Sequence, residues 1–206
     1  MDEVREIAKK MNLSTHAKKD STGICFIGER KFKTFLNQYV QSKPGNIVGL
    51  DGKVIGSHDG VAFYTFGQRK GMRLGGEGEP FFVVGKNVER NELVVTRGTE
   101  HPALFRPYLF ANELNWFSGQ APAAAGEKHA CTAKSRYRQE DQACELTLQA
   151  DGSVRVDFTS PQRALTPGQY VVFYQNEVCL GGGVIYDVGP TLWDSQKAKS
   201  HSEIRA

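Results

Sequence analysis

The stretch HACTAKSRYRQEDQACELTLQADGSVRVDF, residues 129–158, decides the fold of the second half of the chain. Apolar and polar residues alternate along it in three short runs, and this period of two is typical of strands with one buried face. The Asp151-Gly152 pair separates the second run from the third and predicts a tight hairpin turn. Three neighbouring antiparallel strands are therefore expected here.

Further runs with the same period flank this stretch on both sides. They are LFANELNWF (109–117), QYVVFYQ (169–175) and EVCLGGGVI (177–185). The segment SGQAPAAAGE, residues 118–127, has the composition of a linker. Five or six short strands joined by tight turns predict a closed antiparallel β-barrel.

Upstream of the barrel, a smaller group of strands is expected. Asp51-Gly52 lies between NIVGL and KVIGS, which is a strong hairpin signal. Three more strand-like runs follow, GVAFYTF (60–66), PFFVVGKNV (80–88) and ELVVT (92–96). Before them, apolar residues at helical spacing predict two short helices, over VREIAKKMNL (4–13) and over about 29–41.

The predicted fold is therefore mainly β (α+β), with two short N-terminal helices, a small central mixed domain and an antiparallel C-terminal β-barrel. The first helix looks like the last helix of an upstream unit. The polar tail is expected to be frayed. The predicted segments are 1–28 (helix and connector), 29–103 (central domain), 104–187 (barrel) and 188–206 (tail).

Composition and charge exclude several classes of protein. No apolar run is long enough to span a bilayer and the N-terminus has no signal region, so a cytoplasmic protein is expected. The four cysteines are scattered and form no C-x-x-C, so neither a disulfide scaffold nor a metal site is predicted. The net charge is +3, and residues 1–43 hold nine Lys/Arg against five Asp/Glu. Basic clusters there, at 67–73 and at 134–138 suggest a polyanionic partner.

Cys25 lies in KKDSTGICFIGERKF, residues 18–32, and two interpretations of it are open. Nearby lysines and arginines, together with the start of the predicted helix that follows, would lower the pKa of the thiol and favour the reactive thiolate. Its apolar neighbours Ile24 and Phe26 instead favour a small buried side chain. The other three cysteines lie in strand patterns, where a structural role is expected.

Two basic segments are candidates for contacts with nucleic acid. KSRYRQED predicts a strand with Lys134, Arg136 and Arg138 on one face and Tyr137 on the other. Basic groups bind phosphates, and an aromatic ring stacks on an unpaired base. FGQRKGMRLGGEGEP, residues 66–80, lacks the spacing of a nucleotide-binding P-loop and is interpreted as a basic loop for backbone contacts. An ordinary charged outer surface is the alternative for both.

Several motifs occur in the same order as in the tRNA-specific 2-thiouridylase family. They are DSTGICFIGERKF, PGNIVGLDGKVIGSHDG, TFGQRKG, GTEHPALF, KSRYRQ and TPGQYVVFYQNEVCLGGGVI. The chain resembles this family from about residue 2 to residue 186. The resemblance implies a central domain followed by a β-barrel. It also implies conversion of the wobble uridine of certain tRNAs to 2-thiouridine, with ATP activating the base as an adenylate and a cysteine persulfide delivering the sulfur.

The resemblance also implies roles for particular residues. Cys25 matches the cysteine that carries the persulfide, and Arg136 and Tyr137 match a pair that contacts tRNA. Arg138 is an expected accessory, and Gln169 matches a glutamine that approaches tRNA. The implied partners are tRNA and a sulfur-donor protein, with no membrane and an oligomeric state left open. ATP, with magnesium, would be bound by an N-terminal domain, so no cofactor-binding residue and no metal ligand is predicted in this chain.

The chain departs from the family pattern at its beginning. The family has an N-terminal ATP-pyrophosphatase domain with an S-G-G-x-D-S loop and a second catalytic cysteine, and this sequence contains no such loop. It therefore looks like a C-terminal fragment that is inactive alone. The rival hypotheses are a stand-alone RNA-binding β-barrel protein with a structural Cys25, and a small thiol-redox protein. The sequence has no resolving cysteine near Cys25, which counts against the thiol-redox protein.

Overall fold

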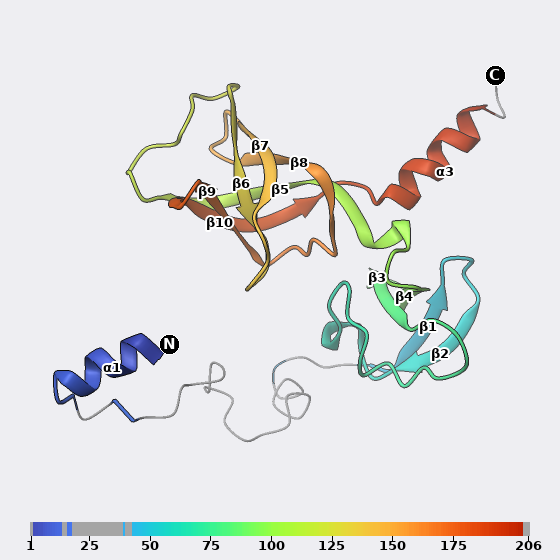
Figure 1. Cartoon of the computed structure of the whole chain (residues 1–206). Coiled ribbons are helices and arrows are strands. Elements are labelled where there is room, and N and C mark those ends of the chain that lie inside the picture. The colour runs from blue at the N-terminus through green and yellow to red at the C-terminus, as the bar shows by residue number, and fades with distance from the viewer. Residues whose placement is uncertain (1, 14–15, 18–38, 40–42, 204–206) are drawn as a thin grey trace. The chain divides into compact units, whose positions relative to one another are not determined.

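The computed structural model of the 206-residue chain describes residues 2–13, 16–17, 39 and 43–203 (Figure 1). It divides the chain into two units, 1–41 and 42–206. Cys25 and the helix predicted over about 29–41, apart from Tyr39, lie outside the described residues.

The first unit contains the helix α1, Asp2–Lys10, as the apolar spacing predicts. The helix ends where Asn12 adopts the left-handed conformation, with φ of 55°. The N–H groups of Asn12 and Leu13 donate to the carbonyls of Lys9 and Ala8. This is the usual pattern of a helix C-terminus closed by asparagine.

The second unit begins with a mixed four-stranded sheet. Its strands run in the order β2-β1-β4-β3, with β1 and β4 parallel and the other pairs antiparallel. Gly52, with φ of 79°, turns the chain between β1 and β2, which confirms the predicted hairpin. The strands are β1 Gly45–Gly49, β2 Val54–His58, β3 Phe81–Asn87 and β4 Glu92–Arg97.

The strand expected at 60–66 is wrong. Val61–Phe63 forms a short 3-10 helix, η2. The Gly60 N–H donates to Nδ1 of His58, and the Phe63 N–H donates to the Gly60 carbonyl, so the chain turns immediately after β2. Phe63 and Tyr64 are consecutive and both buried, an arrangement that alternating strand geometry does not provide.

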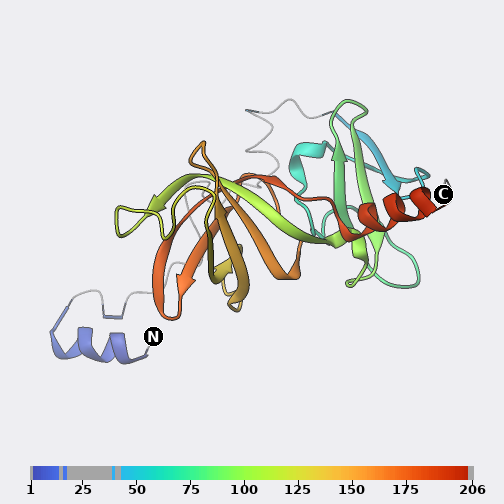
Figure 2. The ribbon, with the colours of Figure 1, turned by 90° about the horizontal axis from the view of Figure 1, so that it is seen from above.

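A closed six-stranded antiparallel barrel follows, as the sequence predicts (Figures 1 and 2). Its strands are neighbours in the order β10-β5-β8-β7-β6-β9. Alternate residues point inward, so that Cys144, Leu146 and Leu148 of β7 are buried while the residues between them are partly exposed. The strands are β5 Phe105–Trp116, β6 Lys128–Lys134, β7 Gln142–Leu148, β8 Val154–Arg163, β9 Tyr170–Gln175 and β10 Val178–Val188.

The expectation of a frayed tail is also wrong. Leu192–Glu203 forms the helix α3, which lies beside the short helix η3, Pro102–Leu104, and the start of β5 (Figure 2). Thr191 and Asp194 exchange hydrogen bonds at its beginning, a capping box. Trp193 packs against the cluster of Phe82, Val84, Ala103 and Leu104. Among the described helices, none is both long and apolar enough to span a bilayer.

Candidate nucleic-acid interface

A cavity of about 420 Å³ brings together three of the four residues predicted to contact RNA. Arg136, Tyr137 and Gln169 come from two turns of the barrel, and they meet a loop that precedes β3. The interface is therefore formed by both parts of the second unit. Its lining consists of Thr65, Phe66, Gly67, Gln68, Arg136, Tyr137, Thr166 and Gln169.

The turn that carries Arg136 and Tyr137 differs from the predicted strand face. β6 ends at Lys134, and the residues that follow form a turn. Hydrogen bonds of the Gln139 side chain stabilise this turn. Gln139 Oε1 accepts from the backbone N–H of Ser135 at 2.9 Å and from the Ser135 hydroxyl at 3.2 Å. Gln139 Nε2 donates to Oε1 of the buried Gln162 at 2.9 Å.

Backbone carbonyls hold the side chain of Arg136, which is exposed and lines the cavity. Its Nη2 donates to the carbonyls of Arg163 at 2.8 Å and Ala164 at 3.1 Å. Desolvation, together with the positive charge of Arg163, lowers the pKa of Arg136. The guanidinium keeps further N–H donors besides Nη2, and it stays charged because the ordinary pKa of arginine is so high. Arg136 is thus both a structural group and an available cation.

Tyr137 and Arg138 form the exposed edge of the turn. The Tyr137 side chain is 89% exposed, and the Arg138 guanidinium lies 5.2 Å from the centre of its ring. Arg138 adopts a left-handed backbone with φ of 61°, so it does not share a strand face with Lys134 and Arg136. It is not among the residues that line the cavity. An exposed aromatic ring beside a guanidinium is a suitable platform for an unpaired base.

Gln169 is presented by the turn that joins β8 to β9. Gly168, with φ of 85°, allows the turn, and the N–H of Gly168 donates to the carbonyl of Ile185. The Ile185 N–H donates in return to the carbonyl of Gln169. Gln169 itself is exposed. The backbone is therefore fixed to β10 while the amide side chain stays at the surface.

The loop before β3, most of it within the basic segment 66–80 expected to contact nucleic acid, supplies Thr65, Phe66, Gly67 and Gln68 to the cavity. Gln68 Oε1 accepts from the Thr65 N–H at 3.0 Å, and Gln68 Nε2 donates to the Lys70 carbonyl at 2.8 Å. The Gly67 N–H donates to the carbonyl of Val83, which ties the loop to β3. The motif TFGQRKG contained this signal, but nothing in it showed which residues would face the barrel.

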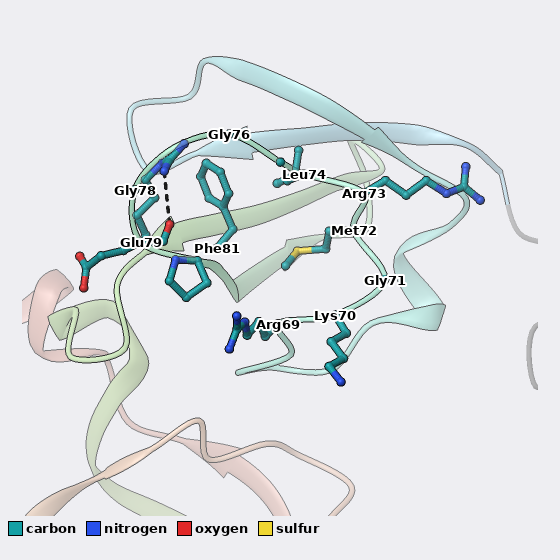
Figure 3. Close-up of a pocket in the computed structure, with 13 residues that line it drawn as sticks. Arg69, Lys70, Gly71, Met72, Arg73, Leu74, Gly76, Gly78, Glu79 and Phe81 are labelled. Carbon is teal, nitrogen blue, oxygen red and sulfur yellow. Dashed lines mark hydrogen bonds between the residues drawn. The ribbon is translucent and has the colours of Figure 1, made fainter.

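A second cavity, of about 390 Å³, is lined by the glycine-rich part of the basic loop, residues 69–80 (Figure 3). Met72 is buried in its floor, whereas the side chains of Lys70 and Arg73 extend outward. Arg97 stacks on the ring of Phe81, with 4.2 Å from Cζ to the ring centre, and donates to the carbonyls of Glu77 and Glu79. These contacts fix the loop in shape, and its basic residues lie on the outside.

The described cysteines are structural, as expected for residues in strands. Cys131 and Cys144 face each other across β6 and β7, with 3.7 Å between their Sγ atoms, and Cys179 is half-buried in β10. The hydrogen bond with Cys131 and burial both raise the pKa of Cys144, so its thiolate is disfavoured. In the part of the chain that the structure describes, no three His, Cys, Asp or Glu side chains form a group that could hold a metal ion.

Three family models match successive parts of the chain. Residues 1–29 match the tRNA methyl transferase HUP domain, and residues 33–97 match the tRNA methyl transferase PRC-barrel domain. Residues 106–185 match the aminomethyltransferase β-barrel domain. The last two matches coincide with the central sheet and the closed barrel. The fold and these matches define the class of protein. It is one in which a central sheet and a C-terminal β-barrel match domain models named after tRNA methyl transferases and aminomethyltransferases.

Two curated relatives identify the family. The tRNA-specific 2-thiouridylase MnmA of Francisella tularensis subsp. tularensis (strain WY96-3418) is 55% identical over 186 residues, which cover 88% of this chain and 51% of the relative. That of Protochlamydia amoebophila (strain UWE25) is 50% identical over 203 residues, which cover 98% and 53%. The chain belongs to the tRNA-specific 2-thiouridylase family. It spans about half the length of the curated relatives it matches.

Proposed function

We propose that this chain is the sulfur-carrying and RNA-binding part of a tRNA-uridine 2-sulfurtransferase. The observation that carries the proposal is the identity of 55% over 186 residues with a tRNA-specific 2-thiouridylase. Cys25 would carry the sulfur as a persulfide, loaded by a sulfur-donor protein. The terminal sulfur would form a bond to carbon 2 of the wobble uridine and replace the activated oxygen, which leaves. The second catalytic cysteine that the resemblance implies would supply the two electrons by cleaving the S–S bond, and it would form a disulfide with Cys25. The reaction would take place on tRNA in the cytoplasm.

The junction between central sheet and barrel supports the RNA-binding part of this proposal. Arg136 would bind a backbone phosphate, because a guanidinium offers several donors in a fixed plane. Tyr137 would stack on an unpaired base, with Arg138 beside it, since the ring is almost fully exposed. Gln169 would donate or accept a hydrogen bond at the edge of a base or at the ribose.

The uridine oxygen must be activated before sulfur can replace it, and ATP with magnesium would supply this activation by forming an adenylate. The described residues do not fit that role, because no three His, Cys, Asp or Glu side chains among them form a group that could hold a metal ion, and the loop 66–80 lacks the spacing of a nucleotide-binding loop. We therefore derive no step of the reaction through ATP. The residues of this chain would receive the sulfur and hold the RNA.

Sulfur loading tests the proposal on the chain itself. The chain would be incubated with a cysteine desulfurase and cysteine, and its intact mass and peptides would be measured without reductant. We expect a gain of one sulfur atom on Cys25, lost in Cys25→Ser and kept in the matched control Cys179→Ser. Loading of Cys179 instead, or of no cysteine, would contradict the role of Cys25.

A further inference from the structure

Two guanidinium groups converge on Gly67, at the point where the loop before β3 meets the barrel. A Cβ atom placed on Gly67 would lie 3.6 Å from Nη2 of Arg136 and 3.6 Å from Nη1 of Arg163. It would also lie 2.6 Å from the Cβ of Ala164, so a larger residue does not fit there without a shift. The absence of a side chain at Gly67 thus leaves room for both arginines.

This arginine pair has no carboxylate partner in the described part of the chain. Five other cations of the described residues are paired with acids, in Lys53–Asp51, Arg73–Asp59, Lys128–Glu145, Lys134–Asp141 and Arg155–Asp157. Arg136 instead has another cation, Arg163, as its charged neighbour. Like charges held together without a counter-charge are unfavourable until an anion binds between them.

Arg163 is held rigidly before any anion binds. It is the last residue of β8, and its Cζ lies 4.7 Å from the centre of the Phe82 ring. Its Nε donates to the carbonyl of Thr99 at 3.4 Å. Arg163 is half-buried, and its Nη1 lies near Gly67, close enough for its charge to act on Arg136. A fixed guanidinium binds an anion at a lower entropic cost than a free one.

We propose that Arg163 is a further RNA-binding residue, which binds, together with Arg136, the backbone phosphate of the nucleotide whose base stacks on Tyr137. This inference rests on the proposed function, because it assumes that RNA occupies the interface. Two guanidinium groups can donate in parallel to the phosphate oxygens, the arrangement that arginine favours. The phosphate would replace the missing counter-charge of the pair.

The test is binding of an unmodified tRNA transcript to the chain over a series of salt concentrations. Arg163→Ala should weaken binding about tenfold at low salt. It should also reduce the slope of log Kobs against log salt by about 0.7 to 0.9, the loss of one phosphate contact. Lys53→Ala removes one positive charge from the distant hairpin between β1 and β2, and it should change neither quantity.

A loss of stacking on Phe82 could unfold the Arg163→Ala variant, so Arg163→Gln is measured as well, with thermal unfolding of each variant as the folding control. Glutamine keeps an aliphatic stem with a polar amide near the ring but removes the charge. The same reduction in the slope of log Kobs against log salt is therefore expected. If Arg163→Gln behaves like Lys53→Ala while the wild-type chain binds tRNA, the inference is overturned and the proposed function stands. If the wild-type chain fails to bind tRNA at low salt, the proposed RNA interface itself is wrong.

Discussion

At the residue scale, the same side chains serve the fold and the interface. Arg136 closes the turn around Ala164 through two carbonyls and also presents its charge to the cavity. The resemblance predicts a role for Arg136, but it could not predict this double use, because the carbonyls come from residues 27 and 28 positions later. Removing Arg136 would therefore confuse loss of structure with loss of RNA contact, and Tyr137 is the cleaner probe.

His101 gives a prediction for the dependence of stability on pH. Its Nδ1 accepts from the Ala103 N–H, its ring lies 5.2 Å from Trp193, and desolvation lowers its pKa below the ordinary 6.5. The folded chain therefore binds this proton less readily than the unfolded chain, so stability falls as the pH drops through 6.5 towards the lowered value.

The measurement is the free energy of unfolding in urea between pH 7.5 and about pH 5. His101→Asn keeps a capping acceptor without a titrating ring, so this variant should lose less stability over that interval than the wild type. Equal losses in both proteins would show that His101 does not contribute.

At the element scale, alternation of apolar and polar residues predicted the barrel strands well, because each strand has one face in the core. The prediction from alternation was wrong at KSRYR. The charged residues there continue the alternating pattern, but β6 ends at Lys134. What ends the strand is the contact of Gln139 with Gln162, which is remote in sequence. The tail helix was missed for the same reason, because Trp193 is ordered by packing against the central sheet.

The glutamine contact predicts a coupled loss of stability and binding. Gln139→Ala removes the acceptor of two Ser135 donors and leaves Oε1 of the buried Gln162 without the Gln139 donor, which should cost about 1–3 kcal/mol. RNA affinity should fall as well, although Tyr137 is still present. Gln120→Ala, in an exposed loop, is the matched control. Unchanged urea midpoints for Gln139→Ala would contradict this account of the turn.

The glycine run in β10 predicts a purely steric effect. A Cβ on Gly182 would lie 2.5 Å from the carbonyl oxygen of Val171, a backbone atom that cannot rotate away. Gly182→Ala should therefore destabilise the barrel by about 1–3 kcal/mol in chemical unfolding. Gly75→Ala meets no atom within 4 Å and should be nearly neutral. Equal stability of the two variants would show that β10 can shift at little cost.

At the scale of the whole molecule, the interface exists only because the central sheet and the barrel meet. The sequence motifs predicted both parts and three of the residues, yet they could not predict that Gly67 would lie against Ala164. This close contact of Gly67 with Ala164 joins residues almost a hundred positions apart in the sequence. Family membership supports the reaction as a proposal, and this interface supports the proposal that RNA binds there.

The central claim, that the turn with Tyr137 binds RNA, is tested most directly by comparing two exposed aromatic residues of the barrel. Tyr137 is 89% exposed and lines the cavity, whereas Phe117, directly after β5, is 69% exposed and does not line it. The measurement is the affinity of the purified chain for an unmodified tRNA transcript at fixed salt.

Tyr137→Ala should weaken binding by about 1–3 kcal/mol, roughly five- to 150-fold, because a base loses its stacking partner. Tyr137→Phe should retain the affinity, and Phe117→Ala should change it less than twofold. Equal, small effects of Tyr137→Ala and Phe117→Ala on tRNA affinity would contradict the account.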